Sequence, residues 1–187
     1  MYEQMAQTYQ TYFANQGLDL EPVKTDGLES GVHQADDEAS RVNSTFVISG
    51  TSTAQQFPGL VSLGSVEAAP LWLFYRGKPV QVDDPLEYFS QRKIAVGTEH
   101  TVTHRMFSTL MELSNPGTGE RSNFLQLAHS DAADKLRKGE IDAMFIVDGF
   151  HSPLIQSLLH DPEIQLMDFA LSDAYIRQLP YLQKVTI

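Results

Sequence analysis

Two hydrophobic patterns alternate along most of the chain. Short apolar runs predict strands, and segments whose apolar positions recur every three or four residues predict helices. The predicted helices are residues 3–16, 28–43, 103–113, 131–138, 152–159 and 173–179. The predicted strands are residues 18–24, 45–49, 71–76, 93–96, 124–127, 143–147 and 164–169, with residues 60–66 weakly extended. This alternation predicts an α/β protein whose parallel sheets are covered by helices on both faces.

A polar segment divides the pattern in two. Residues 77–92 contain Pro79, Pro85 and the pair Asp83 and Asp84, which makes them the candidate linker or hinge. We therefore expect a first α/β lobe over residues 1–78 and a second over residues 79–187. A chain of 187 residues is long enough for two small lobes that each bury a core.

Composition and charge exclude several classes of partner and site. A formal net charge of −11 disfavours phosphate backbones and anionic membranes, so we expect no nucleic-acid partner. The chain has no cysteine, which excludes disulfides, thiol nucleophiles and thiolate metal sites. No apolar run approaches the roughly 18 residues of a membrane span. The first residues are amphipathic rather than basic and then apolar, so no signal peptide is visible.

Small polar residues follow several predicted strands, where ligands of α/β proteins bind. The four turns are residues 25–29, 50–52, 97–103 and 148–152. Glycines within them let a backbone approach a ligand closely, and a nearby aromatic residue can supply an apolar wall. The candidate ligand-binding residues are Thr25, Gly27, Thr51, Tyr75, Thr98, Thr101, Thr103 and Asp148.

The turn at residues 97–103 is the strongest of these candidates. It joins a strand to a helix, and the start of that helix offers free backbone amides and the positive end of a dipole to a carboxylate. Thr101 or Thr103 can donate a hydroxyl to such a ligand. Each of them can equally cap the helix, a common role of threonine.

Catalysis has no positive signal in the sequence. Neither a nucleophile elbow nor a phosphate-cradling glycine loop is present. His100 and His104 lie four residues apart and can share a helix face, but no third metal ligand follows at motif spacing. His100 with Asp148 is the one acid–base pair that an enzyme would use. We therefore expect a non-enzymatic protein without a metal or a cofactor.

Five segments resemble the TAXI-type solute receptors of TRAP transporters. They are residues 17–27, 60–77, 93–97, 132–155 and 174–187. The resemblance implies a periplasmic type II solute-binding protein with a two-lobed Venus-flytrap architecture. Such a receptor binds a small organic anion, such as an amino acid or a dicarboxylate, between its lobes and delivers it to the membrane subunits of the transporter.

The ligand loops differ from the family pattern, although the scaffold residues remain. The glycine-rich Ser-Gly-Thr loop of the family reads HTVT at residues 100–103, so that only Thr103 is identical. The Thr-x-Gly-Ser turn of the family reads TDGL at residues 25–28. A second interpretation therefore stays open, in which a stand-alone interaction protein keeps the scaffold without a transport role.

The first lobe is incomplete by comparison with the family. Family members have a strand before the helix that opens this chain, and they continue beyond Ile187 to return to the first lobe. A lobe without those strands exposes a sheet edge and apolar surface. We therefore expect the chain to form a symmetric homodimer that covers this surface.

Overall fold

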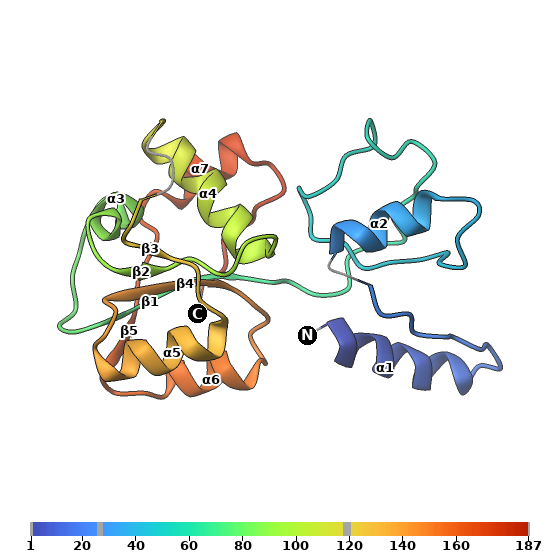
Figure 1. The fold of residues 1–187 in the computed structure, drawn as a ribbon, viewed down its shortest axis with the longest axis horizontal. Helices are drawn as coiled ribbons and strands as arrows, with labels where there is room; N and C mark the ends of the chain where they lie inside the picture. Colours follow the sequence, from blue (N-terminus) through green and yellow to red (C-terminus); the bar gives the residue numbers. More distant parts are fainter. Residues whose placement is uncertain (1, 26–27, 118–120, 187) are drawn as a thin grey trace. The chain divides into compact units, whose positions relative to one another are not determined.

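The computed structural model describes residues 2–25, 28–117 and 121–186. Its contacts divide the chain into two compact units, the first ending at Val66 and the second beginning at Glu67 (Figure 1). Each unit is described by itself. The boundary differs from the one expected between residues 78 and 79, because the strand at residues 71–76 pairs within the second unit.

A five-stranded mixed sheet forms the centre of the second unit, in the order β3-β2-β4-β1-β5. Its strands are β1 (Leu71–Arg76), β2 (Ile94–Ala95), β3 (Phe124–Leu125), β4 (Ala143–Val147) and β5 (Ile164–Leu166). β2 is parallel to β3 and to β4, whereas β1 is antiparallel to β4 and to β5. Four strands therefore run in one direction and β1 runs against them, which corrects the expectation of a wholly parallel sheet.

The direction of β1 follows from how the chain leaves it. β1 ends beside the start of β4, since Tyr75 lies opposite Ala143. β2 also begins at this edge, because it is parallel to β4. The connection from β1 to β2 therefore starts and ends at the same edge of the sheet. Two parallel strands would instead need a connection that crosses a face of the sheet.

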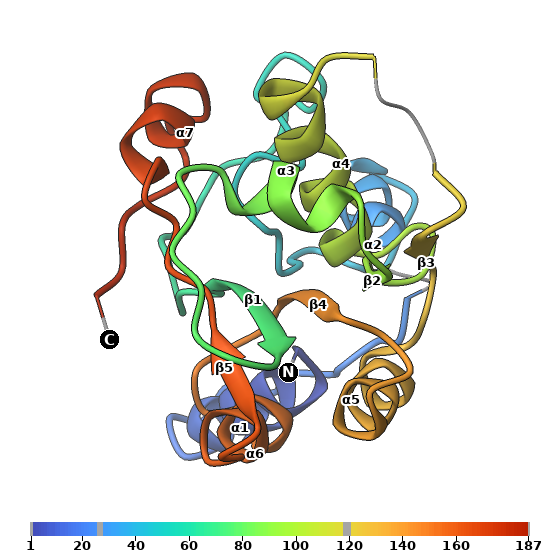
Figure 2. The same cartoon turned by 90° about the vertical axis from the view of Figure 1, so that its left-hand side faces the viewer.

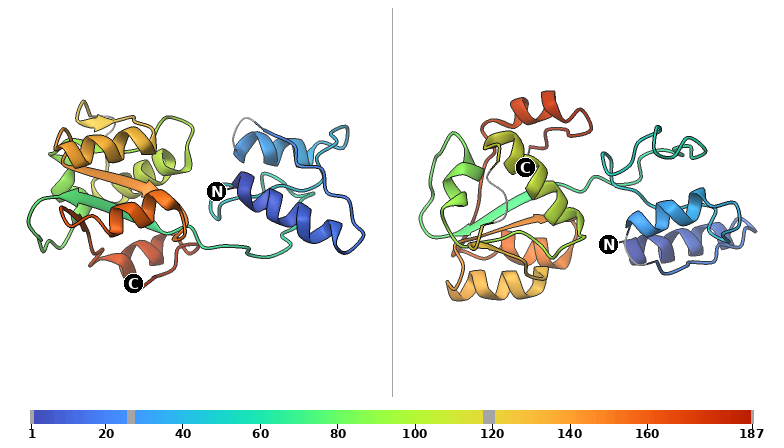
Figure 3. Two further views of the ribbon diagram at one scale, coloured as in Figure 1. Left: turned by 90° about the horizontal axis from the view of Figure 1, so that it is seen from below. Right: turned by 45° about the horizontal axis from the view of Figure 1, so that its top comes forward.

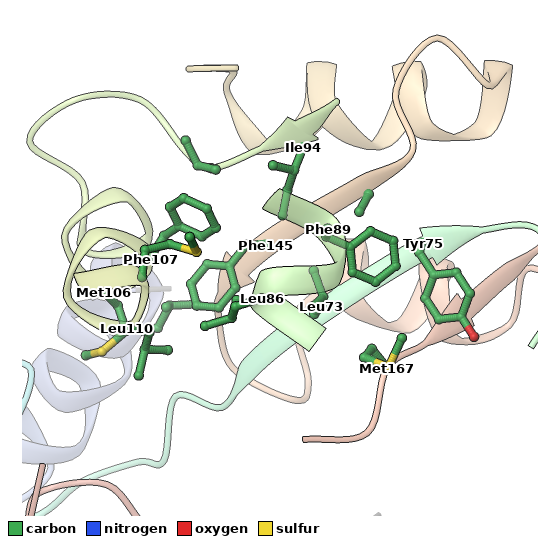
Figure 4. Close-up of a cluster of buried hydrophobic side chains, with 14 of the residues drawn as sticks. Leu73, Tyr75, Leu86, Phe89, Ile94, Met106, Phe107, Leu110, Phe145 and Met167 are labelled. Atoms are coloured by element: carbon green, nitrogen blue, oxygen red, sulfur yellow. The ribbon is translucent and has the colours of Figure 1, made fainter. Parts of the chain in front are cut away.

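Helices cover both faces of the sheet (Figure 2). They are α3 (Pro85–Ser90), α4 (Val102–Ser114), α5 (His129–Lys138), α6 (Pro153–Leu159) and α7 (Ser172–Gln178). Alternate residues of β1 point to opposite faces, as the pleat of a strand requires. Leu73 and Tyr75 pack with α3 and α4, as Figure 4 shows, whereas Trp72 and Phe74 pack with α5 and α6.

The expected linker at residues 77–92 contains a core helix instead. The Asp84 carboxylate caps α3 by accepting hydrogen bonds from the amides of Leu86 and Glu87, each at 3.0 Å, and Pro85 occupies the first turn. Leu86 and Phe89 are buried in the face of the core that α4 covers. The segment is therefore part of the second unit rather than a hinge.

The first unit contains α1 (Tyr2–Ala14) and α2 (Leu28–Asp36), with irregular chain over residues 15–25 and 37–66 (Figure 3). The strands expected at residues 18–24 and 45–49 do not form among its described residues. A strand needs a hydrogen-bonded neighbour, and no described segment of this unit pairs with them. The first unit is therefore not the α/β lobe that the alternating pattern predicted.

None of the helices in the described ranges is both long enough and apolar enough to span a membrane.

The burial of α3 can be tested by truncating its core residue. Leu86→Ala should lower the free energy of unfolding by about 2–5 kcal/mol, because it leaves a cavity in the core. The matched control is Val185→Ala, at a side chain that is 55% exposed, which should change stability by less than about 0.5 kcal/mol. Equal urea midpoints for the two variants would mean that residues 77–92 are the linker that their polarity first indicated.

Candidate functional site

Four strands of the second unit end at one edge of the sheet, because they run in the same direction. We call this the carboxyl edge and define it by residues 96–103, 126–129 and 148–152, which follow β2, β3 and β4. α4 and α5 both begin there. Ligands of open α/β sheets bind beyond the carboxyl ends of the strands, so this edge is the candidate site.

A tight turn brings the β2 strand to the start of α4. Gly97 has a φ of 78°, and a Cβ atom there would lie 2.9 Å from Thr101 Oγ1 and from the side chain of Thr103. Only glycine combines this backbone conformation with so close an approach. His100 also has a positive φ, of 63°, which is uncommon for a residue with a side chain. The loop is therefore pressed against the first turn of α4.

Thr101 acts as the N-cap of α4. Its hydroxyl accepts a hydrogen bond from the His104 amide at 3.3 Å and donates one to the Thr98 carbonyl at 2.6 Å. Both interactions are local and satisfy the backbone of the turn. Of the two roles considered for this threonine, capping is the one that the geometry displays.

Thr103 is buried rather than open to a ligand. Its side chain is 1% exposed, and its hydroxyl accepts a hydrogen bond from the Val147 amide at 3.1 Å. The same oxygen lies 3.0 Å from His129 Nε2. Thr103 therefore joins α4 to the end of β4 and to the first residue of α5, and this placement corrects the expectation that it contacts a ligand.

His129 is a member of the site that the sequence did not single out. It is the first residue of α5, it is partly buried, and its contact with Thr103 spans 26 residues of sequence. Burial lowers the pKa of the imidazole, and the Asp148 carboxylate opposes this effect only in part. His129 is therefore neutral at pH 7, and Asp148 is close enough to act on it electrostatically.

Polar groups remain available along the carboxyl edge. Thr98 is exposed, and no described residue forms a hydrogen bond with its hydroxyl. One Asp148 oxygen accepts a hydrogen bond from the Gly149 amide at 2.9 Å. α5 has no side-chain cap at Ala128, and its first amides have no described partner. Backbone N–H groups at two neighbouring helix starts, a hydroxyl, an imidazole and a carboxylate therefore share this edge.

The other predicted residues lie elsewhere. Tyr75 is 5% exposed, sits at the end of β1 away from the carboxyl edge, and its hydroxyl accepts a hydrogen bond from the Val80 amide at 3.0 Å. It is a core residue, which corrects its assignment as a ligand wall. In the first unit, Thr51 donates a hydrogen bond to the Ile48 carbonyl at 2.7 Å, and Thr25 lies near Gly31. Gly27 lies outside the described residues.

No third metal ligand joins His100 and His104 among the described residues. Across residues 2–25, 28–117 and 121–186, no three His, Cys, Asp or Glu side chains are grouped so that they could hold a metal ion.

Comparison with known proteins does not identify a relative. No protein-family model and no curated protein matches this sequence. The resemblance to solute receptors therefore stays a prediction made from the residues.

The fit of the Gly97 turn gives a direct mutational test. Gly97→Ala should lower the free energy of unfolding by more than 2 kcal/mol, because about 1–2 kcal/mol of left-handed strain adds to the contacts with Thr101 and Thr103. Gly117→Ala is the matched control, since Gly117 has a φ of 77° but open space around the added carbon. Gly117→Ala should lower the free energy of unfolding only by the cost of the left-handed backbone conformation. Equal losses, measured by chemical denaturation, would contradict the close packing of the turn.

Proposed function

We propose that the chain is the solute-binding receptor of a TRAP-type transporter and binds a small organic anion, such as an amino acid or a dicarboxylate, at the carboxyl edge of the second unit. The observation that carries the proposal is the meeting of the first turns of α4 and α5 at the carboxyl edge, where Thr103 contacts His129. Free amides at the start of a helix, together with its dipole, favour an anionic group. α5 has no side-chain cap, whereas Thr101 already caps α4, so the start of α5 is the stronger position for the anionic group.

Asp148 narrows the class of ligand. A carboxylate beside the helix starts repels a second negative charge but pairs with an ammonium group. A ligand that carries both a carboxylate and an ammonium group can bind the helix-start amides with the first and the Asp148 carboxylate with the second. The electrostatic action of Asp148 on the neighbouring His129 is consistent with its lying within reach of such a ligand. We therefore favour an amino acid over a dicarboxylate.

The remaining parts of the proposal rest on the sequence resemblance. A receptor of this family lies in the periplasm, and its partners are the membrane subunits of the transporter. The acidic net charge of −11 gives no reason to add nucleic acid to these partners.

Thermal unfolding against a panel of amino acids, dicarboxylates and 2-oxoacids tests the receptor directly. A ligand present at about 100 times its Kd should stabilise the protein by about 2.7 kcal/mol, which gives a visible increase in Tm.

Thr98→Val should reduce this increase without changing the stability of the free protein, because the Thr98 side chain is exposed. Thr103→Val should destabilise the free protein by about 1–3 kcal/mol, because the Val147 amide loses its acceptor. An unchanged Tm across the panel would contradict the receptor.

A second candidate function, a stand-alone interaction protein that assembles with itself, is favoured by the first unit. Val61 and Leu63 are 81% and 91% exposed, and Val32 is the one hydrophobic residue of the described part of this unit that is buried. Exposed apolar side chains are typical of an interaction site where they lie together in one patch.

Self-association should appear as a homodimer in light scattering at micromolar concentration. Replacing Val61 and Leu63 together by Ser should shift the distribution toward monomer, because it removes apolar surface from the contact. Val185→Ser, at an exposed residue of the second unit, serves as the control and should leave the dimer intact. A monomer across the whole concentration range would exclude this candidate.

A further inference from the structure

The hydroxyl of Thr103 makes two hydrogen-bonding contacts, one with the end of β4 and one with the start of α5. A hydroxyl has one hydrogen and two acceptor positions. The Val147 amide occupies one acceptor position, and His129 Nε2 lies 3.0 Å from the same oxygen. If Nε2 carries no hydrogen, it accepts the hydroxyl hydrogen of Thr103, so that the hydroxyl both donates and accepts a hydrogen bond. The neutral imidazole with its hydrogen on Nδ1 therefore fits this position.

A protonated imidazole does not fit as well. Both of its nitrogens are donors, so Nε2–H and the Thr103 hydroxyl hydrogen would both point into the same contact. The hydroxyl could turn to accept from Nε2–H, but its own hydrogen would then need another acceptor. Thr103 is 1% exposed, and no further partner of its hydroxyl exists among the described residues. Leaving a buried donor unsatisfied is costly.

We propose that the Thr103–His129 hydrogen bond is a pH-sensitive latch, which joins the first turns of α4 and α5 while the imidazole is neutral and opens when it takes up a proton. The latch lies at the carboxyl edge, so its opening would loosen the packing of the candidate site. It is a property of the free protein and does not depend on which ligand binds, or on whether one does.

The charges around His129 bear on the pH at which the latch opens. The titratable and charged groups in the loops and first turns that meet there are Glu99, His100, His104 and Arg105 at the start of α4, Asp148 and His151 after β4, and Asp131 on α5 itself. Of these, Asp148 acts on His129 and favours the protonated imidazole, while burial favours the neutral one more strongly. The pKa of His129 is thus lowered on folding, and the latch closes at neutral pH.

The direction of the pH effect follows from this lowered pKa. The unfolded chain binds a proton at about pH 6.5, the ordinary histidine value, whereas the folded protein binds it only at lower pH. The stability that the latch contributes is therefore fully present above about pH 6.5. It is lost as the pH falls below that value, through the folded pKa of His129.

An NMR titration of the full chain tests the latch without any ligand. The imidazole of His129 and the backbone amide of Val147 are followed from pH 8 to pH 4.5. We expect both signals to move with one shared midpoint below about 6.5, because the amide senses the Thr103 hydroxyl to which it donates. A Val147 amide that does not follow the imidazole, or an imidazole that titrates at the ordinary value, would overturn the proposal.

Three variants separate the latch from neighbouring titrations. His129→Gln should abolish the shared step at Val147, because a carboxamide accepts the Thr103 hydrogen but does not titrate. His151→Gln, at an exposed residue of the same edge, should leave the step unchanged. Asp148→Asn should keep the step but move it to lower pH, because it removes the charge that favours the imidazolium. If His129→Gln does not fold, the titrations of the wild type and of Asp148→Asn test the proposal by themselves. A shared midpoint of His129 and the Val147 amide that does not fall to lower pH in Asp148→Asn would contradict the latch.

Discussion

The second unit depends on the antiparallel pairing of β1 with β4. Five residue pairs, from Leu71 opposite Val147 to Tyr75 opposite Ala143, place these two strands side by side in the sheet. Their side chains alternate between two apolar clusters, so a single pairing supports both faces of the core. Every residue of β4 is buried, which shows how central this pair is. The flanking helices pack on a surface that this pairing creates.

The same pairing positions the candidate site. Because β4 ends where β1 begins, the last amide of β4 is left at the carboxyl edge, where it donates to the buried hydroxyl of Thr103. Thr103 in turn contacts His129, so the starts of α4 and α5 are tied to the central strand rather than only to each other. A change in the protonation of one imidazole can therefore reach the centre of the sheet through a single hydroxyl. The site and the core share one hydrogen-bonded connection.

Much of the second unit could be predicted from the sequence, because its signals are local. The apolar runs at residues 71–76 and 143–147 form the strands expected of them, and Gly139 ends α5 in a left-handed conformation. The core helix α3 was missed although Asp84 and Pro85 form a start signal, because the polarity of residues 77–92 outweighed it.

The remaining differences are not local. An apolar run forms a strand only if another segment pairs with it, and the runs of the first unit have no partner among the described residues. The role of His129 depends on a contact across 26 residues of sequence, which no short pattern reports. Conversely, the buried Thr103 and the core residue Tyr75 matched the expected residue types of a ligand site but face the interior.

The most direct test of the carboxyl edge as a ligand site is to map amide NMR shifts on adding the amino acids of the panel. The account predicts shifts concentrated in residues 97–103, 128–131 and 148–149; shifts confined to other parts of the chain, or none with any amino acid, would contradict it.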